Sequence, residues 1–337
     1  MQHRLYETID RAIAYLRRSQ LDHGEWPTFV SPDSTLASAR ELDSTPFATA
    51  LILYCVREIE GEHLAKQIDA ALAFLRADMR GAGLWCYWSR FHPRRQEAPP
   101  DLDDIACVAW VLRDHAVEFP SCEALVLDHR NAEGLLRTWL VPRRESTPAF
   151  KRALRSAWTP SLSELFTALP LRDMVDMGVL ANALLFLGQE DDRVKPSIAK
   201  LIDCVNSNCE IEHGDYYTSR PLIWYFISRA YRHGVSALEP ARAPILAKID
   251  ARLDGETSLQ DRALMITTLL NLSAPVSVAA QLPALLDGQH KDGSWPAESA
   301  YIFGGRERAG GLFYGSEALT TGFCVEALAR ARATLHA

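Results

Sequence analysis

The stretch LRRSQLDHGEW (16–26) decides the fold, because two later stretches repeat it in the same register. These are LRADMRGAGLW (75–85) and LLDGQHKDGSW (285–295). Each contains Leu, three residues, Gln or Met, three residues, Gly, one residue and then Trp. Three matches at one spacing indicate an internal repeat, and repeated units of about 20–50 residues indicate a repetitive architecture.

Each repeat predicts a helix, a tight turn and a second helix. We expect the glycine to end the first helix, because Gly tolerates a positive φ there. We expect the Trp to fold back over the helix end as an apolar plug. An acidic residue then opens a second apolar segment, at 41–45, 101–105 and 315–319. The repeating unit is therefore a helical hairpin.

The chain between the repeats is also predicted to be helical. Stretches 173–188, 220–234 and 261–272 have apolar residues at a period near 3.6, and segments of period 2 are scarce. A hairpin of about 55 residues fits the 337-residue chain roughly six times. The sequence thus predicts an all-α fold, in which six hairpins close into one (α/α)6 barrel domain over residues 1–337. The loops 89–100 and 141–163 are expected at its rim.

Composition excludes several classes of protein. The net charge is -7, and no basic stripe interleaved with aromatic residues appears, so we expect no nucleic-acid partner. The seven cysteines lack a C-x-x-C spacing, which favours free thiols in a reducing cytoplasm. The longest apolar run, 47–56, is about half of the roughly 20 residues that a membrane span needs. We expect a soluble cytoplasmic protein.

The motif Asp101-Leu102-Asp103-Asp104 has two readings. It follows two prolines and opens a helix, so its carboxylates could simply cap free amides and oppose the helix dipole. However, it supplies three carboxylates where capping needs one or two, and it lies inside a repeat. Cys107 and Trp110 continue an apolar stripe from Asp103, which directs that acid into the barrel. We therefore interpret the motif as an acid site.

Repeat and motif together resemble a known family. The Q-x-x-x-G-x-W pattern is similar to the QW repeats of class II terpene cyclases such as squalene–hopene cyclase, and PPDLDDIACVAWVL (99–112) is similar to their D-x-D-D helix. Those cyclases have two helical domains, whereas this chain has room for one. The chain thus most resembles the single-domain meroterpenoid cyclases of the merosterolic acid type. The resemblance spans nearly the whole chain.

The resemblance implies a reaction and a substrate class. A prenylated aromatic acid, such as geranylgeranyl dihydroxybenzoate, would be protonated at its terminal alkene and cyclised without loss of diphosphate. Asp103 would donate the proton, with Asp101 and Asp104 assisting, and the reaction needs no metal and no other cofactor. The lipophilic substrate also implies transient membrane association for its pickup.

Protonating an isolated alkene needs an acid that keeps its proton at neutral pH. The helix N-terminus lowers the pKa of Asp103, whereas burial and the neighbouring carboxylates raise it. Carboxylates this close titrate as a coupled set. The carbocation then needs aromatic faces, each contributing up to about 2 kcal/mol when dry. Candidates, Trp110 first and each with packing as the alternative role, are Trp85, Tyr87, Trp88, Trp110, Trp158, Tyr217, Trp224, Tyr301, Phe313 and Tyr314.

Several further residues have two open interpretations. Asp43, in Glu41-Leu42-Asp43-Ser44, is either a helix cap or a second functional carboxylate. Asp176 and Asn182 are candidates for the cavity wall. A benzoate head group could pair with an arginine, and solvated rim positions are the alternative for each of Arg90, Arg94, Arg95, Arg306 and Arg308. The base that removes the last proton cannot be identified from the sequence.

Three other functions compete. A class II cyclase of a prenyl diphosphate would use Mg2+, and the one acidic cluster that stands out is 189–192, which we expect to be a solvated turn. A protein prenyltransferase would need zinc ligands, and neither the cysteines nor the histidines have that spacing. A barrel that only binds a lipid or a protein is the non-enzymatic alternative.

Overall fold

The computed structural model describes residues 2–59, 63–212, 216–253, 255, 257–303 and 311–336. Six helices form a closed ring, in which each packs against the next and the last against the first. In ring order these inner helices are α2 (Pro46–Val56), α4 (Leu102–Asp114), α8 (Met177–Leu187), α10 (Arg220–Arg232), α12 (Leu259–Asn271) and α14 (Glu317–His336).

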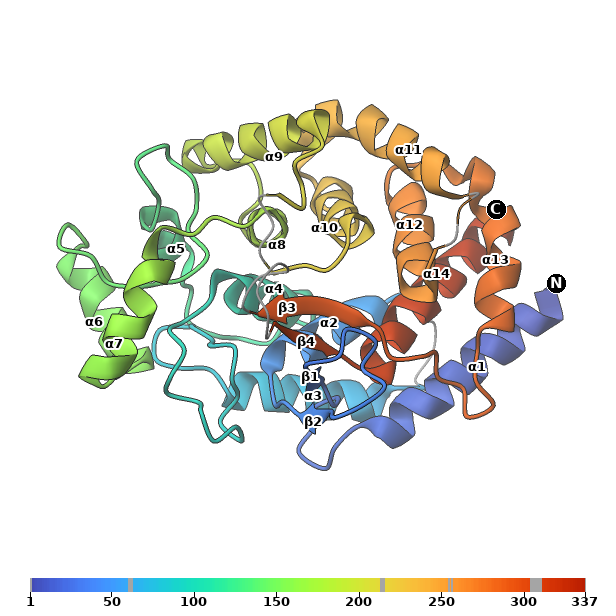
Figure 1. Ribbon diagram of the computed structural model, residues 1–337, viewed down its shortest axis with the longest axis horizontal. Helices are drawn as coiled ribbons and strands as arrows, with labels where there is room; N and C mark the ends of the chain where they lie inside the picture. Colours follow the sequence, from blue (N-terminus) through green and yellow to red (C-terminus); the bar gives the residue numbers. More distant parts are fainter. Residues whose placement is uncertain are drawn as a thin grey trace.

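A second layer of helices surrounds this ring (Figure 1). It consists of α1 (Gln2–Ser19), α3 (Ala65–Ala77), α9 (Lys195–Ser207), α11 (Glu239–Leu253) and α13 (Val278–Asp287). The last four pack against one or both of their sequence neighbours in the ring, and α1 packs against α14. The predicted (α/α)6 helical barrel is thus confirmed. Short 3-10 helices are η1 (Leu169–Asp173), η2 (Asp192–Val194), η3 (Ser236–Leu238) and η4 (Pro275–Ser277).

One insertion departs from the regular alternation. Helices α5 (Glu123–Asp128), α6 (Pro148–Ala157) and α7 (Leu162–Ala168) follow α4 in the chain, and α6 and α7 project from one side of the ring. The expectation of a loop over 141–163 was therefore wrong for its central part. Pro148 occupies the first turn of α6 behind the capping residue Thr147, a combination that starts helices.

The two layers differ in sequence pattern for a physical reason. All eleven residues of α2 are buried, as an inner helix surrounded on every side requires. In α1 the buried residues recur along one face, which includes Leu5, Ile9 and Leu16. Each inner helix begins behind a side chain that accepts a hydrogen bond from its first turn. These caps are Thr45, Asp101, Asp176, Ser219, Ser258 and Ser316.

The repeat tryptophans form the predicted plugs. Trp26, Trp85 and Trp295 are fully buried. The indole of each donates a hydrogen bond to the carbonyl of the leucine that opens its own repeat, over 2.9, 2.8 and 2.9 Å. This bond fixes the length of the repeat, because the ring can reach the helix end only from that position.

The repeat glycines take a positive φ, of 96° at Gly24, 78° at Gly83 and 92° at Gly293. The helices nevertheless end several residues earlier, so the expectation that each glycine ends its helix was wrong. The glycine instead lies in the turn, pressed against a neighbouring segment. A Cβ would come within 2.1 to 2.2 Å of a backbone carbonyl oxygen at all three positions.

The repeat glutamines join neighbouring outer helices. Gln20 donates to the carbonyls of Gly24 and of Gln67 in α3. Gln289 donates in the same way to Gly293 and to Thr8 in α1, over 3.0 and 2.9 Å. The last repeat is therefore tied to the first helix, which closes the outer layer.

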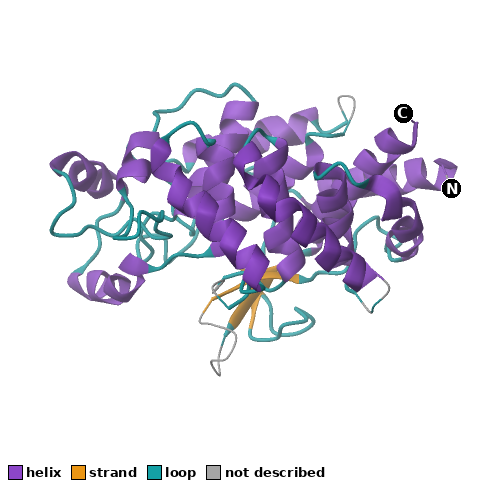
Figure 2. Cartoon of the chain, turned by 90° about the horizontal axis from the view of Figure 1, so that it is seen from above, coloured by secondary structure: helices purple, strands orange, loops and turns teal. Residues whose placement is uncertain are grey.

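A small sheet, which the sequence did not predict, lies along one edge of the helical body (Figure 2). Its antiparallel strands run in the order β2-β1-β4-β3. Each has two to five residues, too few for a periodic pattern to be recognised. The strands are β1 (Phe29–Ser31), β2 (Glu41–Leu42), β3 (Ser299–Phe303) and β4 (Leu312–Gly315).

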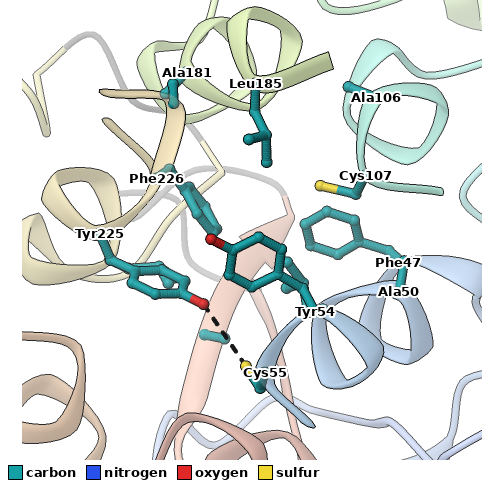
Figure 3. Packing of buried hydrophobic residues seen from close by; sticks show 14 of the residues in the cluster. Phe47, Ala50, Tyr54, Cys55, Ala106, Cys107, Ala181, Leu185, Tyr225 and Phe226 are labelled. Atoms are coloured by element: carbon teal, nitrogen blue, oxygen red, sulfur yellow. Dashed lines mark hydrogen bonds between the residues drawn. The ribbon is translucent and has the colours of Figure 1, made fainter. Parts of the chain in front are cut away.

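The interior of the ring is packed with side chains rather than open. Phe47, Tyr54, Cys107, Leu185 and Phe226 approach one another from α2, α4, α8 and α10 (Figure 3). The seven cysteines are all buried as free thiols. Among the described residues, no helix combines the length and the apolar character needed to cross a bilayer.

Candidate active site

A cavity of about 550 Å³ opens where the inner helices begin. Phe47 of α2, Asp103 of α4 and Val179 of α8 contribute to it from the first turns of their helices. Residues of β3, β4 and α7 and of several irregular segments complete the wall. Its volume falls within the roughly 300–1,000 Å³ of small-molecule sites. Because the helices converge here and the strands cover them, residues far apart in the sequence meet at this place.

Asp103 lies in the wall of this cavity and is only 7% exposed. Its Oδ1 accepts a hydrogen bond of 2.7 Å from the Nδ2 of Asn182, on α8. Its Oδ2 is hydrogen-bonded to the hydroxyl of Tyr217, in the segment before α10. Three elements of the barrel therefore fix the position of this one carboxyl group.

A relay behind Asn182 determines which oxygen of Asp103 can hold a proton. Arg229, on α10, donates to the Oδ1 of Asn182. Because a guanidinium can only donate, the amide of Asn182 must turn its NH2 group toward Asp103. The Oδ1 of Asp103 is thus an acceptor, and a proton on this carboxyl resides on Oδ2, beside Tyr217.

Arg229 is itself a buried charge, 1% exposed. Its guanidinium lies over the rings of Tyr54, Tyr225 and Phe226, at 4.5, 5.0 and 4.7 Å from their centroids. Aromatic faces stabilise a cation by their quadrupole, which offsets part of the cost of burial. Nothing in the local sequence distinguishes this arginine from the other basic residues of its helix, and sequence reasoning missed it.

The other two acids of the motif differ in role. Asp101 is the helix cap and accepts from the N–H of Asp103 over 2.8 Å. Burial raises the pKa of Asp101 to about 7. Asp104 is buried as well, and its Oδ1 has no hydrogen-bond partner among the described residues. The capping interpretation is therefore right for Asp101, while Asp103 and Asp104 do not cap the helix.

Burial prevails over the helix dipole at the central acid. The pKa of Asp103 lies well above its usual range, first because of burial and then because of the neighbouring Asp101. The pKa of Asp104 is raised in the same way, by burial and then by Asp101 and Asp103. Asp103 therefore keeps its proton to a higher pH than an ordinary aspartate does.

Five of the predicted aromatic residues line the cavity: Tyr87, Trp88, Tyr217, Tyr301 and Tyr314. Tyr301 and Tyr314 stack at 5.2 Å from neighbouring strands, and Tyr87 meets both rings edge-on. The strands that carry Tyr301 and Tyr314 were not predicted, yet their sheet forms this part of the wall.

Two predicted residues beside the cavity point elsewhere, which corrects the expectation for them. Trp85 is occupied as the plug of its own repeat and bonds to Leu75. Phe313 lies between Leu312 and Tyr314 on β4, and both of those line the cavity. Because side chains alternate along a strand, Phe313 faces the opposite side of the sheet.

Three more predicted residues lie away from the cavity, again a correction. Trp110 lies seven residues along α4 from Asp103, where its ring packs 4.8 Å from that of His233. Trp158 donates to the carbonyl of Gln96 over 2.9 Å. Trp224 donates to Glu210, a partner that it shares with Lys248 of α11. The stripe below Asp103 thus leads into packed core rather than along the cavity.

The cavity also has aromatic walls that sequence reasoning missed. Phe47 lies in the first turn of α2. Trp139 and Tyr216 lie in irregular segments, and the indole of Trp139 donates to the hydroxyl of Tyr216 over 2.8 Å. Neither segment carries a periodic pattern, so no signal in the sequence placed them here.

The weaker candidates are resolved individually. Thr45, not Asp43, caps α2, so the capping interpretation of Asp43 was wrong. Asp176 caps α8, while Asn182 contacts Asp103 directly. Asp191 and Asp192 pair with Arg193 and Lys195 at the start of η2 and α9. Within the described ranges, no group of three or more His, Cys, Asp or Glu is placed to hold a metal ion.

Arg94 is the candidate head-group arginine that lines the cavity. It lies over the ring of Trp88, 4.4 Å from its centroid, and pairs with Glu97. Arg90 and Arg95 instead donate to backbone carbonyls of their own loop and of α3. Arg306 and Arg308 lie outside the described residues.

Comparisons with known proteins agree at the level of the fold. No family model matches the sequence, and no curated protein matches it. The structure is similar to a crystal structure of a protein from Actinoplanes, at 16% identity and a TM-score of 0.67, over 98% of this chain and 99% of that one. It is also similar to a variant of the type II terpene cyclase MstE from Scytonema, in complex with its substrate geranylgeranyl dihydroxybenzoate. That match has 16% identity and a TM-score of 0.64, and covers 98% of both chains. The chain therefore shares the fold of a class II terpene cyclase.

Proposed function

We propose that this protein is a class II terpene cyclase, working as one barrel domain, that protonates a prenylated aromatic acid and cyclises it. The observation that carries the proposal is the state of Asp103. It is a buried carboxyl group in the wall of a cavity, with its pKa well above the usual range and its proton confined to Oδ2. A general acid for a very weak base needs this combination of retained proton and fixed direction.

The cavity wall supports the steps that would follow protonation. Rings of Trp88, Trp139 and Tyr301 face the space where a cation would migrate. Each can stabilise positive charge by up to about 2 kcal/mol in a dry site. These rings give a migrating cation π faces over part of the cavity wall.

The substrate class rests on the resemblance of the sequence and on the ligand of MstE, a geranylgeranyl dihydroxybenzoate. Arg94 gives the cavity a cation that could pair with the carboxylate of such a head group. The prenyl chain would then extend toward Asp103, with its last alkene at Oδ2. No metal takes part in this scheme.

Delivery of so lipophilic a substrate suggests contact with a membrane. Leu162 and Phe166 of α7 are 77% and 71% exposed and are one helical turn apart. Ser163 and Thr167 of the same helix line the cavity. We propose that α7 touches the bilayer at the cavity mouth, since exposed apolar side chains on an amphipathic helix favour the interface.

The test is an incubation of purified protein with geranylgeranyl dihydroxybenzoate in the presence of EDTA. The proposal predicts a product of unchanged mass that has lost several alkenes, and no product with Asp103→Asn. Geranylgeranyl diphosphate with Mg2+ is the parallel reaction. Turnover only of geranylgeranyl diphosphate would show that the substrate is a prenyl diphosphate. Binding of either compound without turnover would indicate a barrel that only binds lipids.

A further inference from the structure

A second buried carboxylate, Asp43, lies directly behind the cavity wall. It is 5% exposed, and it does not cap the helix that follows it. Its Oδ2 accepts a hydrogen bond of 2.8 Å from the hydroxyl of Tyr87. Its Oδ1 accepts from the indole of Trp88 over 3.2 Å and lies 3.1 Å from the Nε2 of His92. Tyr87 and Trp88 both line the cavity.

The tautomer of His92 is fixed by its other nitrogen. The backbone N–H of Arg94 donates to Nδ1 over 3.1 Å, so that nitrogen is an acceptor. The proton of a neutral His92 is therefore on Nε2 and points at Asp43. Trp88 stacks on His92, with the rings 5.1 Å apart and 8° from parallel, and holds the imidazole in this orientation.

Asp43 and Asp103 consequently have opposite surroundings. Asp43 receives three donors, from a phenol, an indole and an imidazole, which is the environment of a carboxylate anion. Asp103 also has hydrogen-bond partners, Asn182 and Tyr217, but the neighbouring Asp101 and Asp176 raise its pKa. Burial raises the pKa of Asp43 too, while Tyr87, His92 and Trp88 oppose that rise. Two carboxyl groups in contrasting environments at one cavity are the arrangement of an acid and a base.

A phenol links the anion to the cavity. The hydroxyl of Tyr87 donates its one proton to Asp43, so its oxygen can only accept hydrogen bonds from other groups. The hydroxyl of Tyr301, also in the wall, lies 3.3 Å from it. The oxygen of Tyr87 thus stands between the space of the cavity and the carboxylate.

We infer that Tyr87 and Asp43 together accept the proton that the cyclised carbocation loses. The inference deepens the proposed function and rests on it. The C–H bond next to the cationic carbon breaks, and its electron pair becomes the new alkene. The proton goes to the oxygen of Tyr87 as the phenolic proton moves to Oδ2 of Asp43. Asp43 later returns that proton to water, and Asp103 takes one up, so the reaction is a net isomerisation.

The experiment follows substrate and products separately. Wild type, Asp43→Asn, Tyr87→Phe and the double variant are each incubated with geranylgeranyl dihydroxybenzoate, and all species are quantified by mass spectrometry. Asp33→Asn and Tyr231→Phe are matched controls, since both residues are partly exposed and neither lines the cavity. Melting curves report whether each protein is folded. Tyr87→Phe removes only the hydroxyl and keeps the ring, so it can test the relay even if Asp43→Asn does not fold.

The inferred role predicts that protonation survives while its termination changes. Both single variants should consume substrate within about tenfold of wild type, but form the wild-type product about 10²-fold more slowly, as is typical of losing a general base. Water adducts and alkene isomers should replace that product. The double variant should match the singles, because both changes break one relay.

Three results would overturn the role. First, folded single variants could form the wild-type product at the wild-type rate. Second, they could stop consuming substrate altogether, which would mean that Asp43 is needed at or before the protonation step. The double variant could also show the summed effect of two independent sites. If wild type leaves the substrate untouched, the proposed function itself fails and takes this role with it, so the two failures are distinguishable.

Discussion

Gly178 leaves the space that the ring of Tyr217 occupies. A Cβ at position 178 would lie 2.2 Å from Cε2 of that ring, far inside any tolerated contact. Gly178 is in the first turn of α8, where its φ is not positive. The backbone therefore does not require a glycine here, whereas the ring of Tyr217 does. The hydroxyl of Tyr217 then reaches Oδ2 of Asp103. The position of the proposed acid thus depends on a missing methyl group one helix away.

Gly178→Ala is accordingly predicted to displace Tyr217 and impair the acid. We expect turnover to fall about 10²-fold or more, as misplacement by about 1 Å commonly costs. The control is Gly322→Ala in α14, where a Cβ would meet its nearest neighbour at 3.4 Å, an ordinary contact. Turnover and melting temperature are measured for both. Equal activity of the two variants would show that Tyr217 does not need this space.

Removing the charge of Arg229 is predicted to shift the pH profile. Its positive charge lowers the pKa of Asp103, opposing burial and Asp101, the larger effects. Arg229→Gln should therefore raise that pKa and move the alkaline limb of kcat/KM to higher pH. Arg229→Lys keeps the charge and should leave the limb near its wild-type position. The rate is measured across pH in both variants. If the alkaline limb of kcat/KM stays at the same pH in Arg229→Gln, the charge of Arg229 does not influence the pKa of Asp103.

The acid cluster also predicts how stability depends on pH. A carboxyl whose pKa is raised on folding contributes stability in full below the ordinary Asp value of about 3.9, and that contribution is lost as pH rises through its folded pKa. For Asp101 the loss extends to about pH 7, and for Asp104 it extends up to the raised pKa of that group in the folded protein.

Asp104→Asn removes one such group at nearly constant shape. Its melting temperature relative to wild type should therefore increase as pH rises above about 3.9, until pH passes the raised pKa of Asp104 in the folded protein. Thermal melts of both proteins across this range give the difference directly. A difference independent of pH would mean that Asp104 is ionised in the folded protein.

The closure of the outer layer can be tested by its glutamines. Gln289→Ala removes the bonds to Gly293 and Thr8, and we expect a loss of about 1–3 kcal/mol in the free energy of unfolding, since buried acceptors are left unpaired. Met79→Ala, at the matching position of the second repeat, breaks no such bond. Chemical denaturation compares the two. A larger loss in the free energy of unfolding for Met79→Ala than for Gln289→Ala would contradict the assignment of these bonds.

The sequence predicted the fold because the repeat encodes contacts that are local. Each repeat tryptophan bonds to a leucine ten positions earlier, so the spacing itself carries the geometry. The sheet escaped prediction because its pairs join residues as distant as Phe29 and Gly315, and its strands are short. Where each helix ends was also misjudged, because the glycines serve contacts with neighbouring segments.

The site was only partly predictable for a related reason. The three acids lie within four residues, and the start of their helix can be recognised from the sequence. Arg229 and Tyr216 reach the site through the packing of separate elements, which no local pattern records. Trp110 was favoured from its spacing to Asp103, but a distance of two helical turns takes it out of the cavity and into the core.

In the proposed reaction, Asp103 delivers a solvent-derived proton to an alkene. Turnover of geranylgeranyl dihydroxybenzoate in D2O tests it most directly. We predict a cyclised product that carries a single deuterium at the protonated end of the prenyl chain, and no such product from Asp103→Asn. A cyclised product without deuterium, or one formed equally by Asp103→Asn, would contradict it.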